Sequence, residues 1–273
     1  MRRLVIDHGA ATDVGLVRTT NEDSYLDCPP VFVVADGMGG HDGGDVASRI
    51  VVEEFEQLAD RMLDLAGATS AVHDVLGAAQ ERITGYAAQM REQGAADFVS
   101  GTTCVAAMVV DAPAGPEWLL VNVGDSRLYQ LSSGELAQLS IDHSVVQEMV
   151  DSGRLTPDEA ARHPERNVVT RALGGVAPSE PDLFHVSLPP GTRLLLCSDG
   201  VSGMIADDHI ARILAADTDA RETAERLVAA ALEAGGRDNA TAIVVDVVGL
   251  ADENPDDSAQ QGASLEQKLG VLP

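Results

Sequence analysis

The stretch Val31-Phe32-Val33-Val34-Ala35-Asp36-Gly37-Met38-Gly39-Gly40-His41 predicts a central strand with a functional residue at its end. Its first five residues are apolar and rich in β-branched side chains, which is typical of a buried strand. The strand runs directly into Asp36, and the glycines that follow predict a turn there. We therefore expect a carboxylate where a central strand of a sheet meets solvent.

Three further aspartates, Asp125, Asp199 and Asp238, also lie at the ends of apolar runs. Carboxylates gathered on one rim repel each other, and burying each costs several kcal/mol unless a cation compensates it. Because basic residues are scarce, the expected cations are Mg²⁺ or Mn²⁺. Gly37 fits this interpretation because its backbone carbonyl can approach the same ion. Taken alone, an Asp-Gly pair is more often a plain turn.

The charge balance excludes several classes of protein. The 273 residues include 18 Lys and Arg against 44 Asp and Glu, a formal net charge of −26, and aromatic residues make up 3%. A nucleic-acid partner needs a basic face and often stacking aromatics, so we expect none. Lys268 is the only lysine in the sequence, which excludes a Gly-Lys-Ser/Thr nucleotide loop and a kinase-type strand lysine.

The apolar content of 45% is enough for a large core in one domain. Because no segment approaches the roughly 20 apolar residues of a membrane span, we expect no membrane partner. Cys28, Cys104 and Cys197 are odd in number and far apart, which favours reduced thiols over disulfides. These features predict a cytoplasmic protein, which we expect to be a monomer.

The order of elements indicates an α+β fold. Helical periodicity extends over residues 46–65, 72–90 and 221–234, and the pair Ser133-Gly134 predicts a hairpin in an antiparallel meander over 119–139. The segregation of strands and helices favours antiparallel sheets between helix layers. Strands are predicted at 31–35, 102–110, 118–123, 127–131, 193–197 and 240–248.

Two segments depart from this pattern. Residues 142–175 contain prolines, charges and short helical patterns, which predicts an insertion over one edge of a sheet. From residue 250 to 273 the composition becomes acidic and polar, which predicts a disordered tail. A single folded domain is therefore expected over residues 1–249.

Six ordered motifs resemble the bacterial branch of the metal-dependent Ser/Thr protein phosphatases, the PPM family or type 2C phosphatases. The resemblance covers residues 7–248 and implies an α-β-β-α sandwich of two antiparallel sheets flanked by helix pairs, with 142–175 as a flap beside the active site. The motifs are Asp13-Val14-Gly15-Leu16-Val17-Arg18-Thr19-Thr20-Asn21-Glu22-Asp23, Asp36-Gly37-Met38-Gly39-Gly40-His41, Ser100-Gly101-Thr102-Thr103, Gly124-Asp125-Ser126-Arg127, Ser198-Asp199-Gly200 and Asp238-Asn239.

The resemblance also implies the metal ligands. Asp36 would bridge two Mn²⁺ or Mg²⁺ ions, Gly37 would lend its carbonyl to one of them, and Asp199 and Asp238 would complete the other. Asp125 would belong to a weaker third site, to which Asn167 of the flap could add a weak amide ligand.

Other positions would support catalysis. Arg18 would bind the substrate phosphate, and Glu22 and Asp23 would hold metal-bound water and the network around it, with Asn239 behind them. Outside such a motif, Arg18 would by default pair with Glu22 on the surface. Arg127 is expected to be a structural partner of nearby carboxylates.

The implied reaction is hydrolysis of phosphoserine and phosphothreonine in proteins by a water that two metal ions activate. The expected substrates are Ser/Thr protein kinases and their targets. Some relatives outside bacteria have a histidine where this chain has Met38, so metal-bound water is the first candidate for the general acid and His41 the second. The alternatives are a catalytically weak module that binds phosphoproteins and a hydrolase of small phosphate esters.

Overall fold

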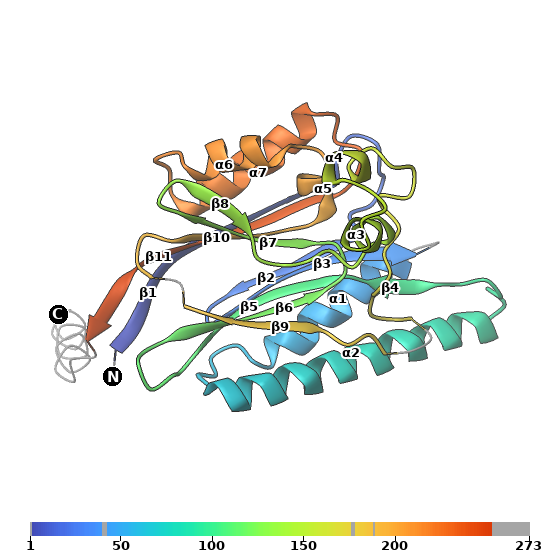
Figure 1. Ribbon diagram of the computed structural model, residues 1–273. Coiled ribbons are helices and arrows are strands. Elements are labelled where there is room, and N and C mark those ends of the chain that lie inside the picture. Colours follow the sequence, from blue (N-terminus) through green and yellow to red (C-terminus); the bar gives the residue numbers. More distant parts are fainter. Residues whose placement is uncertain (1, 40–42, 176–177, 188, 253–273) are drawn as a thin grey trace, which may run out of the picture.

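Two antiparallel sheets stack face to face at the centre of the computed structural model, which describes residues 2–39, 43–175, 178–187 and 189–252 (Figure 1). The first sheet has the order β1-β11-β10-β7-β8: β1 (Arg2–Asp13), β11 (Ala240–Asp252), β10 (Arg193–Cys197), β7 (Arg127–Ser132) and β8 (Glu135–Gln138). The second has the order β2-β3-β5-β6-β9: β2 (Asp23–Cys28), β3 (Val31–Gly39), β5 (Cys104–Val110), β6 (Glu117–Val123) and β9 (Asp182–Val186), with β4 (Ser100–Thr102) paired to β3.

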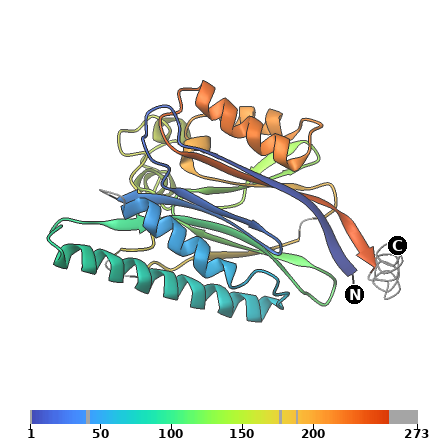
Figure 2. The same ribbon diagram turned by 180° about the vertical axis from the view of Figure 1, so that it is seen from behind.

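Helices cover the outer face of each sheet, so the molecule has four layers (Figures 1 and 2). Helices α1 (Gly43–Glu56) and α2 (Leu65–Glu92) cover the second sheet. Helices α5 (Asp199–Ser202), α6 (Asp207–Leu214) and α7 (Ala220–Glu233) cover the first. The predicted α-β-β-α sandwich is confirmed.

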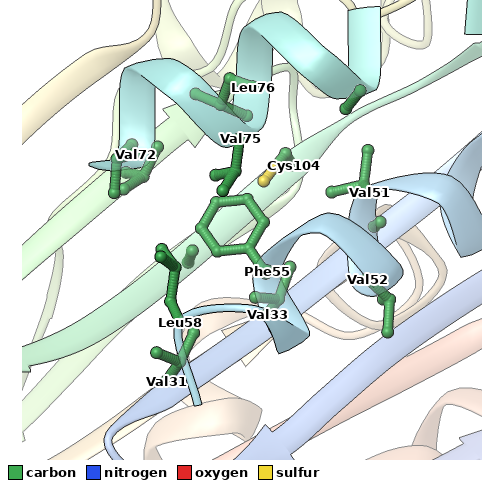
Figure 3. Close-up of a cluster of buried hydrophobic side chains, with 14 of the residues drawn as sticks. Val31, Val33, Val51, Val52, Phe55, Leu58, Val72, Val75, Leu76 and Cys104 are labelled. Carbon is green, nitrogen blue, oxygen red and sulfur yellow. The ribbon is translucent and has the colours of Figure 1, made fainter. Parts of the chain in front are cut away.

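Strand β3 shows why its sequence is a continuous apolar run. Val31 and Val33 pack toward α1 and α2, whereas Phe32 and Val34 belong to the cluster between the sheets. Both faces of the strand are therefore buried, and no polar alternation is possible. On the helix side, Phe55 of α1 is almost fully buried (Figure 3).

Three sequence predictions need correction. The helix predicted over 46–65 ends at Glu56, because the chain turns through Asp60 with φ of 63° and leaves Met62 53% exposed. The hairpin at Ser133-Gly134 is confirmed, but β6 and β7 lie in different sheets, so 119–139 is not one meander. Periodicity also missed β1, β2 and β9, whose short or mixed patterns carry weak strand signals.

The C-terminal boundary lies slightly beyond the predicted one. Strand β11 continues to Asp252, past residue 249, and the rest of the predicted tail, 253–273, lies outside the described residues. The insertion at 142–175 contains two short helices, α3 (Val145–Asp151) and α4 (Pro157–Ala160). None of the helices in the described ranges is long and apolar enough to cross a membrane.

Candidate active site

The predicted aspartates converge at one rim of the sandwich. Asp23 opens β2 and lies opposite Asp36 of β3 in the strand register. Asp199 begins α5 directly after β10, and Asp238 precedes β11, the strand next to β10. Asp125 lies in the short link where the chain crosses from β6 to β7. Strand order therefore gathers five carboxylates that are far apart in the sequence.

Asp36 lies at the centre of this group. Its pKa is raised well above the ordinary value, first by desolvation and then by the charges of Asp23, Asp199, Asp125 and Asp238. Four neighbouring carboxylates thus disfavour the ionised form of Asp36, as expected for like charges in a poorly solvated site. A bound cation would offset this repulsion and favour the ionised form of Asp36.

Asp23 is fixed by hydrogen bonds on one side only. Its Oδ2 accepts hydrogen bonds from Ser198 Oγ at 2.8 Å and from Thr241 Oγ1 at 2.6 Å, whereas its buried Oδ1 has no partner. Desolvation raises the pKa of Asp23 to about 7, against the lowering effect of these two hydroxyls. A buried carboxylate oxygen without a partner indicates a missing donor or ion.

Asp125 and Asp199 share this environment. Desolvation and the charges of Asp199 and Asp142 raise the pKa of Asp125 to about 7, although Arg127 opposes the shift. The pKa of Asp199 is raised by desolvation and by Asp238, while a hydrogen bond with Asp36 lowers it. Each carboxylate is thus perturbed by the others more than by any base.

Arg18 is the basic residue that reaches this rim. Its Nη2 donates a hydrogen bond to Asp238 Oδ2 at 2.8 Å, and 49% of its side chain is exposed. The default pairing with Glu22 is therefore wrong, although the charge of Arg18 still lowers the pKa of Glu22 against the larger effect of desolvation. The arginine is held beside the carboxylates and remains open to solvent.

Asn239 fastens the loop that carries Arg18 and Glu22. Its Oδ1 accepts a hydrogen bond from the Glu22 amide at 2.8 Å, and its Nδ2 donates to the carbonyls of Val14 and Thr20 at 2.9 Å. The Glu22 carbonyl in turn accepts a hydrogen bond from the Gly37 amide at 3.2 Å. Asn239 therefore links the loop to the strand that bears Asp36.

Sequence reasoning missed Thr103 as a support of the site. Its Oγ1 accepts a hydrogen bond from the Asp36 amide at 3.0 Å, and its own amide donates to the Asp36 carbonyl at 2.9 Å. Thr103 Oγ1 also lies 2.8 Å from Ser126 Oγ, next to Asp125. The motif Ser100–Thr103 marked this residue, but only the fold reveals what it holds.

The predictions for Arg127 and for Asn167 of the flap have different outcomes. Arg127 binds Asp142 through Nε and through Nη2 at 2.7 Å, so its predicted structural role is confirmed. Asn167 is exposed, and within the described part of the chain no hydrogen bond joins its side chain to Asp125, so its role as a ligand stays a prediction. His41, the second candidate for the general acid, lies outside the described residues.

The donor set fits hard divalent cations. Asp23, Asp125, Asp199 and Asp238 offer carboxylate oxygens around Asp36, and the buried Oδ1 atoms of Asp23 and Asp45 have no partner. No three His, Cys, Asp or Glu side chains in the described ranges are placed so that they could hold a metal ion by themselves. Backbone carbonyl and water ligands would have to complete the coordination, as Mg²⁺ and similar ions prefer.

A two-sheet sandwich with carboxylates and one open arginine at its rim defines the class of metal-dependent phosphatases. The family model described as protein phosphatase 2C matches residues 19–235. The chain belongs to this family.

Individual relatives agree. The chain is 40% identical over 245 residues to the serine/threonine protein phosphatase PstP of Mycobacterium tuberculosis, covering 90% of this chain and 46% of that one. It thus spans less than half of that relative. It is 34% identical to the serine/threonine phosphatase Stp of Listeria monocytogenes, covering 86% and 93%. The crystal structure of the PstP catalytic domain in complex with two manganese ions superimposes with a TM-score of 0.76 at 39% identity, covering 90% and 100%.

Proposed function

We propose that this protein hydrolyses phosphoserine and phosphothreonine in other proteins with the help of Mn²⁺ or Mg²⁺. The observation that carries this proposal is the convergence of Asp23, Asp125, Asp199 and Asp238 on Asp36, with Arg18 open to solvent beside them. The names of the PstP and Stp relatives as serine/threonine phosphatases support the choice of substrate class.

Six positions would hold two metal ions and a weaker third. Asp36, the Gly37 carbonyl, Asp199 and Asp238 would hold the pair, and Asp125 would hold the third with a contribution from Asn167. The two manganese ions in the PstP structure support the pair. When bound, divalent ions would lower the pKa of a water so that hydroxide is available to attack phosphorus near neutral pH, and they would neutralise the incoming phosphate.

Arg18 would bind and orient the phosphate. Its guanidinium offers two parallel donors, which match two oxygens of a phosphate. To do so Arg18 exchanges Asp238 for the substrate, and its exposure makes this exchange possible without moving the fold. Asn239 would keep the Arg18 loop at the right distance from β3.

Asp23 and Glu22 would order water at the rim. Ser198 and Thr241 hold one oxygen of Asp23, which leaves its Oδ1 free to accept a hydrogen bond from water. Glu22, anchored through its backbone by Asn239, lies within the electrostatic reach of Arg18 and faces the same rim. Both residues would thus fix the direction of the attacking oxygen.

The physiological setting follows from the family and the chain. We expect Ser/Thr protein kinases and their targets as substrates, with a monomeric catalytic domain that includes β11 up to Asp252 and a flap at 142–175. The three free thiols, two of them buried, support a reducing compartment and hence the cytoplasm.

A comparison of substrates tests the proposal. Hydrolysis of a phosphothreonine peptide and of an aryl phosphate should require Mn²⁺ or Mg²⁺ and stop with EDTA. Faster turnover of small phosphate metabolites than of the peptide would instead indicate a small-ester hydrolase. Peptide binding without turnover at saturating metal would indicate a non-catalytic binding module.

A further inference from the structure

The turn that carries Asp125 is attached to the base of the flap by a buried histidine. His143 is 5% exposed and lies just before the first flap helix. Its backbone amide donates to the Gly124 carbonyl at 2.9 Å, and the Gly124 amide donates to His143 Nδ1 at 3.1 Å. His143 therefore binds both the backbone amide and the carbonyl of Gly124, the residue directly before Asp125.

The other ring nitrogen of His143 is held by Asp182. Because Nδ1 accepts the Gly124 amide proton, the neutral ring carries its proton on Nε2, which lies 3.1 Å from Asp182 Oδ2. Arg171 Nη1 lies 3.0 Å from Asp182 Oδ1 and holds the carboxylate in place. Arg171 also lies 3.2 Å from Nε2, but in this tautomer two donors face each other, so that contact is not a hydrogen bond.

The opposite side of the Asp125 turn is tied to Asp36. Ser126 Oγ lies 2.8 Å from Thr103 Oγ1, which accepts the Asp36 amide proton. A continuous chain of contacts therefore runs from Asp182 through His143, the Asp125 turn and Thr103 to the backbone of Asp36. Gly124 permits the turn because its φ is +114° and a Cβ there would lie 2.6 Å from Thr103.

The flap begins and returns at the same residue. The Thr170 amide donates to the His143 carbonyl at 2.7 Å, and the Val145 amide donates to the Val168 carbonyl at 2.9 Å. Asp142, one residue earlier, is bound by Arg127, two residues after Asp125. The two ends of the flap and the two flanks of Asp125 thus meet at Asp142 and His143.

We propose that His143 is a positioning residue that fixes the Asp125 turn to the base of the flap and thereby sets the affinity of the third metal site. This inference rests on the proposed function, because Asp125 matters as a ligand there. Removing a residue that hydrogen-bonds to a metal ligand and orients it typically lowers metal affinity or activity by about 10- to 100-fold. The bond that matters is Gly124 N–H to Nδ1, and Asp182 orients the ring that accepts it.

Two substitutions test the roles of the two ring nitrogens one at a time. In His143→Asn, the amide oxygen replaces Nδ1 and can still accept the Gly124 proton. In His143→Gln, the terminal amide replaces Nε2 and can still donate to Asp182, but the acceptor for Gly124 is lost. His185→Gln is the matched control, because His185 lies on β9 with Asp182 and contacts Glu117 instead.

The test measures Mn²⁺ binding by calorimetry, amide hydrogen exchange at residues 124–126, and kcat and KM for an aryl phosphate. His143→Gln should weaken the weakest Mn²⁺ site about 10-fold or more, speed exchange at the turn and lower kcat with little change in KM. His143→Asn should recover most of the wild-type binding and exchange, and the control should match wild type.

Equal Mn²⁺ binding and exchange in His143→Asn and His143→Gln would overturn the inference. So would a loss of thermal stability in His143→Gln without any change in the weakest Mn²⁺ site. Gln is close in size to the ring and Asn is smaller, so better binding in His143→Asn than in His143→Gln could not come from better packing. Failure of the proposed function would instead show as a wild-type protein without phosphatase activity, and the binding and exchange data do not need turnover.

Discussion

Arg18 Nη2 donates a hydrogen bond to Asp238 Oδ2 across 2.8 Å, although 220 positions separate the two residues in the sequence. The guanidinium of Arg18 thus pairs with one carboxylate of the rim. The same guanidinium is the proposed ligand of the substrate phosphate. Substrate and Asp238 therefore compete for one guanidinium, while a metal ion at Asp238 would release it.

Arg18→Ala should weaken substrate binding and leave metal binding intact. A hydrogen bond to a charged group contributes about 1.5–3 kcal/mol, so KM for an aryl phosphate should rise about tenfold or more. Arg18→Lys keeps the charge but not the planar pair of donors, so its KM should lie between those of the wild type and Arg18→Ala. Steady-state kinetics with Mn²⁺ calorimetry checks this; weaker Mn²⁺ binding with unchanged KM would show that Arg18 serves the metals instead.

Asp36→Asn should abolish activity without destabilising the metal-free protein. Asp36 is a proposed metal ligand rather than an outer partner, so kcat should fall by more than about 100-fold. The pKa of Asp36 is raised by desolvation and four like charges, so removing its charge relieves repulsion. In EDTA at pH 8 the melting temperature should equal or exceed that of wild type.

The control for Asp36→Asn is Asp74→Asn on the exposed side of α2. This substitution should change neither kcat nor the melting temperature. A lower melting temperature for Asp36→Asn in EDTA would mean that the carboxylate stabilises the fold through contacts other than metal, against the reasoning above.

Metal removal should make stability depend on pH in a defined direction. The pKa values of Asp23 and Asp125 are raised to about 7, chiefly by desolvation, whereas an unfolded carboxyl titrates near 4. Between these values the folded state binds more protons than the unfolded state, so the free energy of unfolding falls as pH rises from about 4 to about 7. In EDTA the protein should melt at a lower temperature at pH 8 than at pH 5.

Mn²⁺ should reverse that loss by pairing with the ionised carboxylates. At 100 times its dissociation constant, one bound ion adds about 2.7 kcal/mol to the free energy of unfolding, or about 5–10 °C in melting temperature. The gain should be larger at pH 8 than at pH 5, because protons compete at low pH. Thermal unfolding at both pH values measures it, and an equal gain at both would count against a carboxylate site.

The fold and the rim were predictable to different degrees. The runs that became β3, β5, β6, β10 and β11 are apolar because both of their faces are buried, so pattern alone identified them. Strand β2 alternates weakly and lies at a sheet edge, and pattern alone could not distinguish it from a loop. The crossing of β6 and β7 into different sheets depends on packing between layers, which local sequence does not encode.

The same limit applies to the supports of the site. Asp36, Asp125 and Asp199 were visible as carboxylates after apolar runs and Asp238 as one before such a run, since chemistry and strand ends are local features. Asp23 was marked only by the family resemblance. Thr103 and His143 act through partners 67 and 19 positions away, so their roles emerge only when the sheets are stacked. The default partner of Arg18 was wrong for this reason, because Asp238 comes close to it only in the folded chain.

Gly200→Ala should damage the rim far more than its size suggests. A Cβ at Gly200 would lie 1.7 Å from the Asn239 carbonyl oxygen, so the turn after Asp199 and the turn after Asp238 must separate. We expect a loss of more than about 1–3 kcal/mol in the free energy of unfolding, the cost typical of overpacking, together with weaker Mn²⁺ binding.

Gly77→Ala is the matched control, because a Cβ at this exposed position in α2 meets nothing within 4 Å. It should raise the free energy of unfolding by about 0.5–1 kcal/mol, since alanine loses less conformational entropy in a helix. Urea unfolding of both variants measures the difference, and a Gly200→Ala protein as stable as Gly77→Ala would show that the contact between the two turns is not needed.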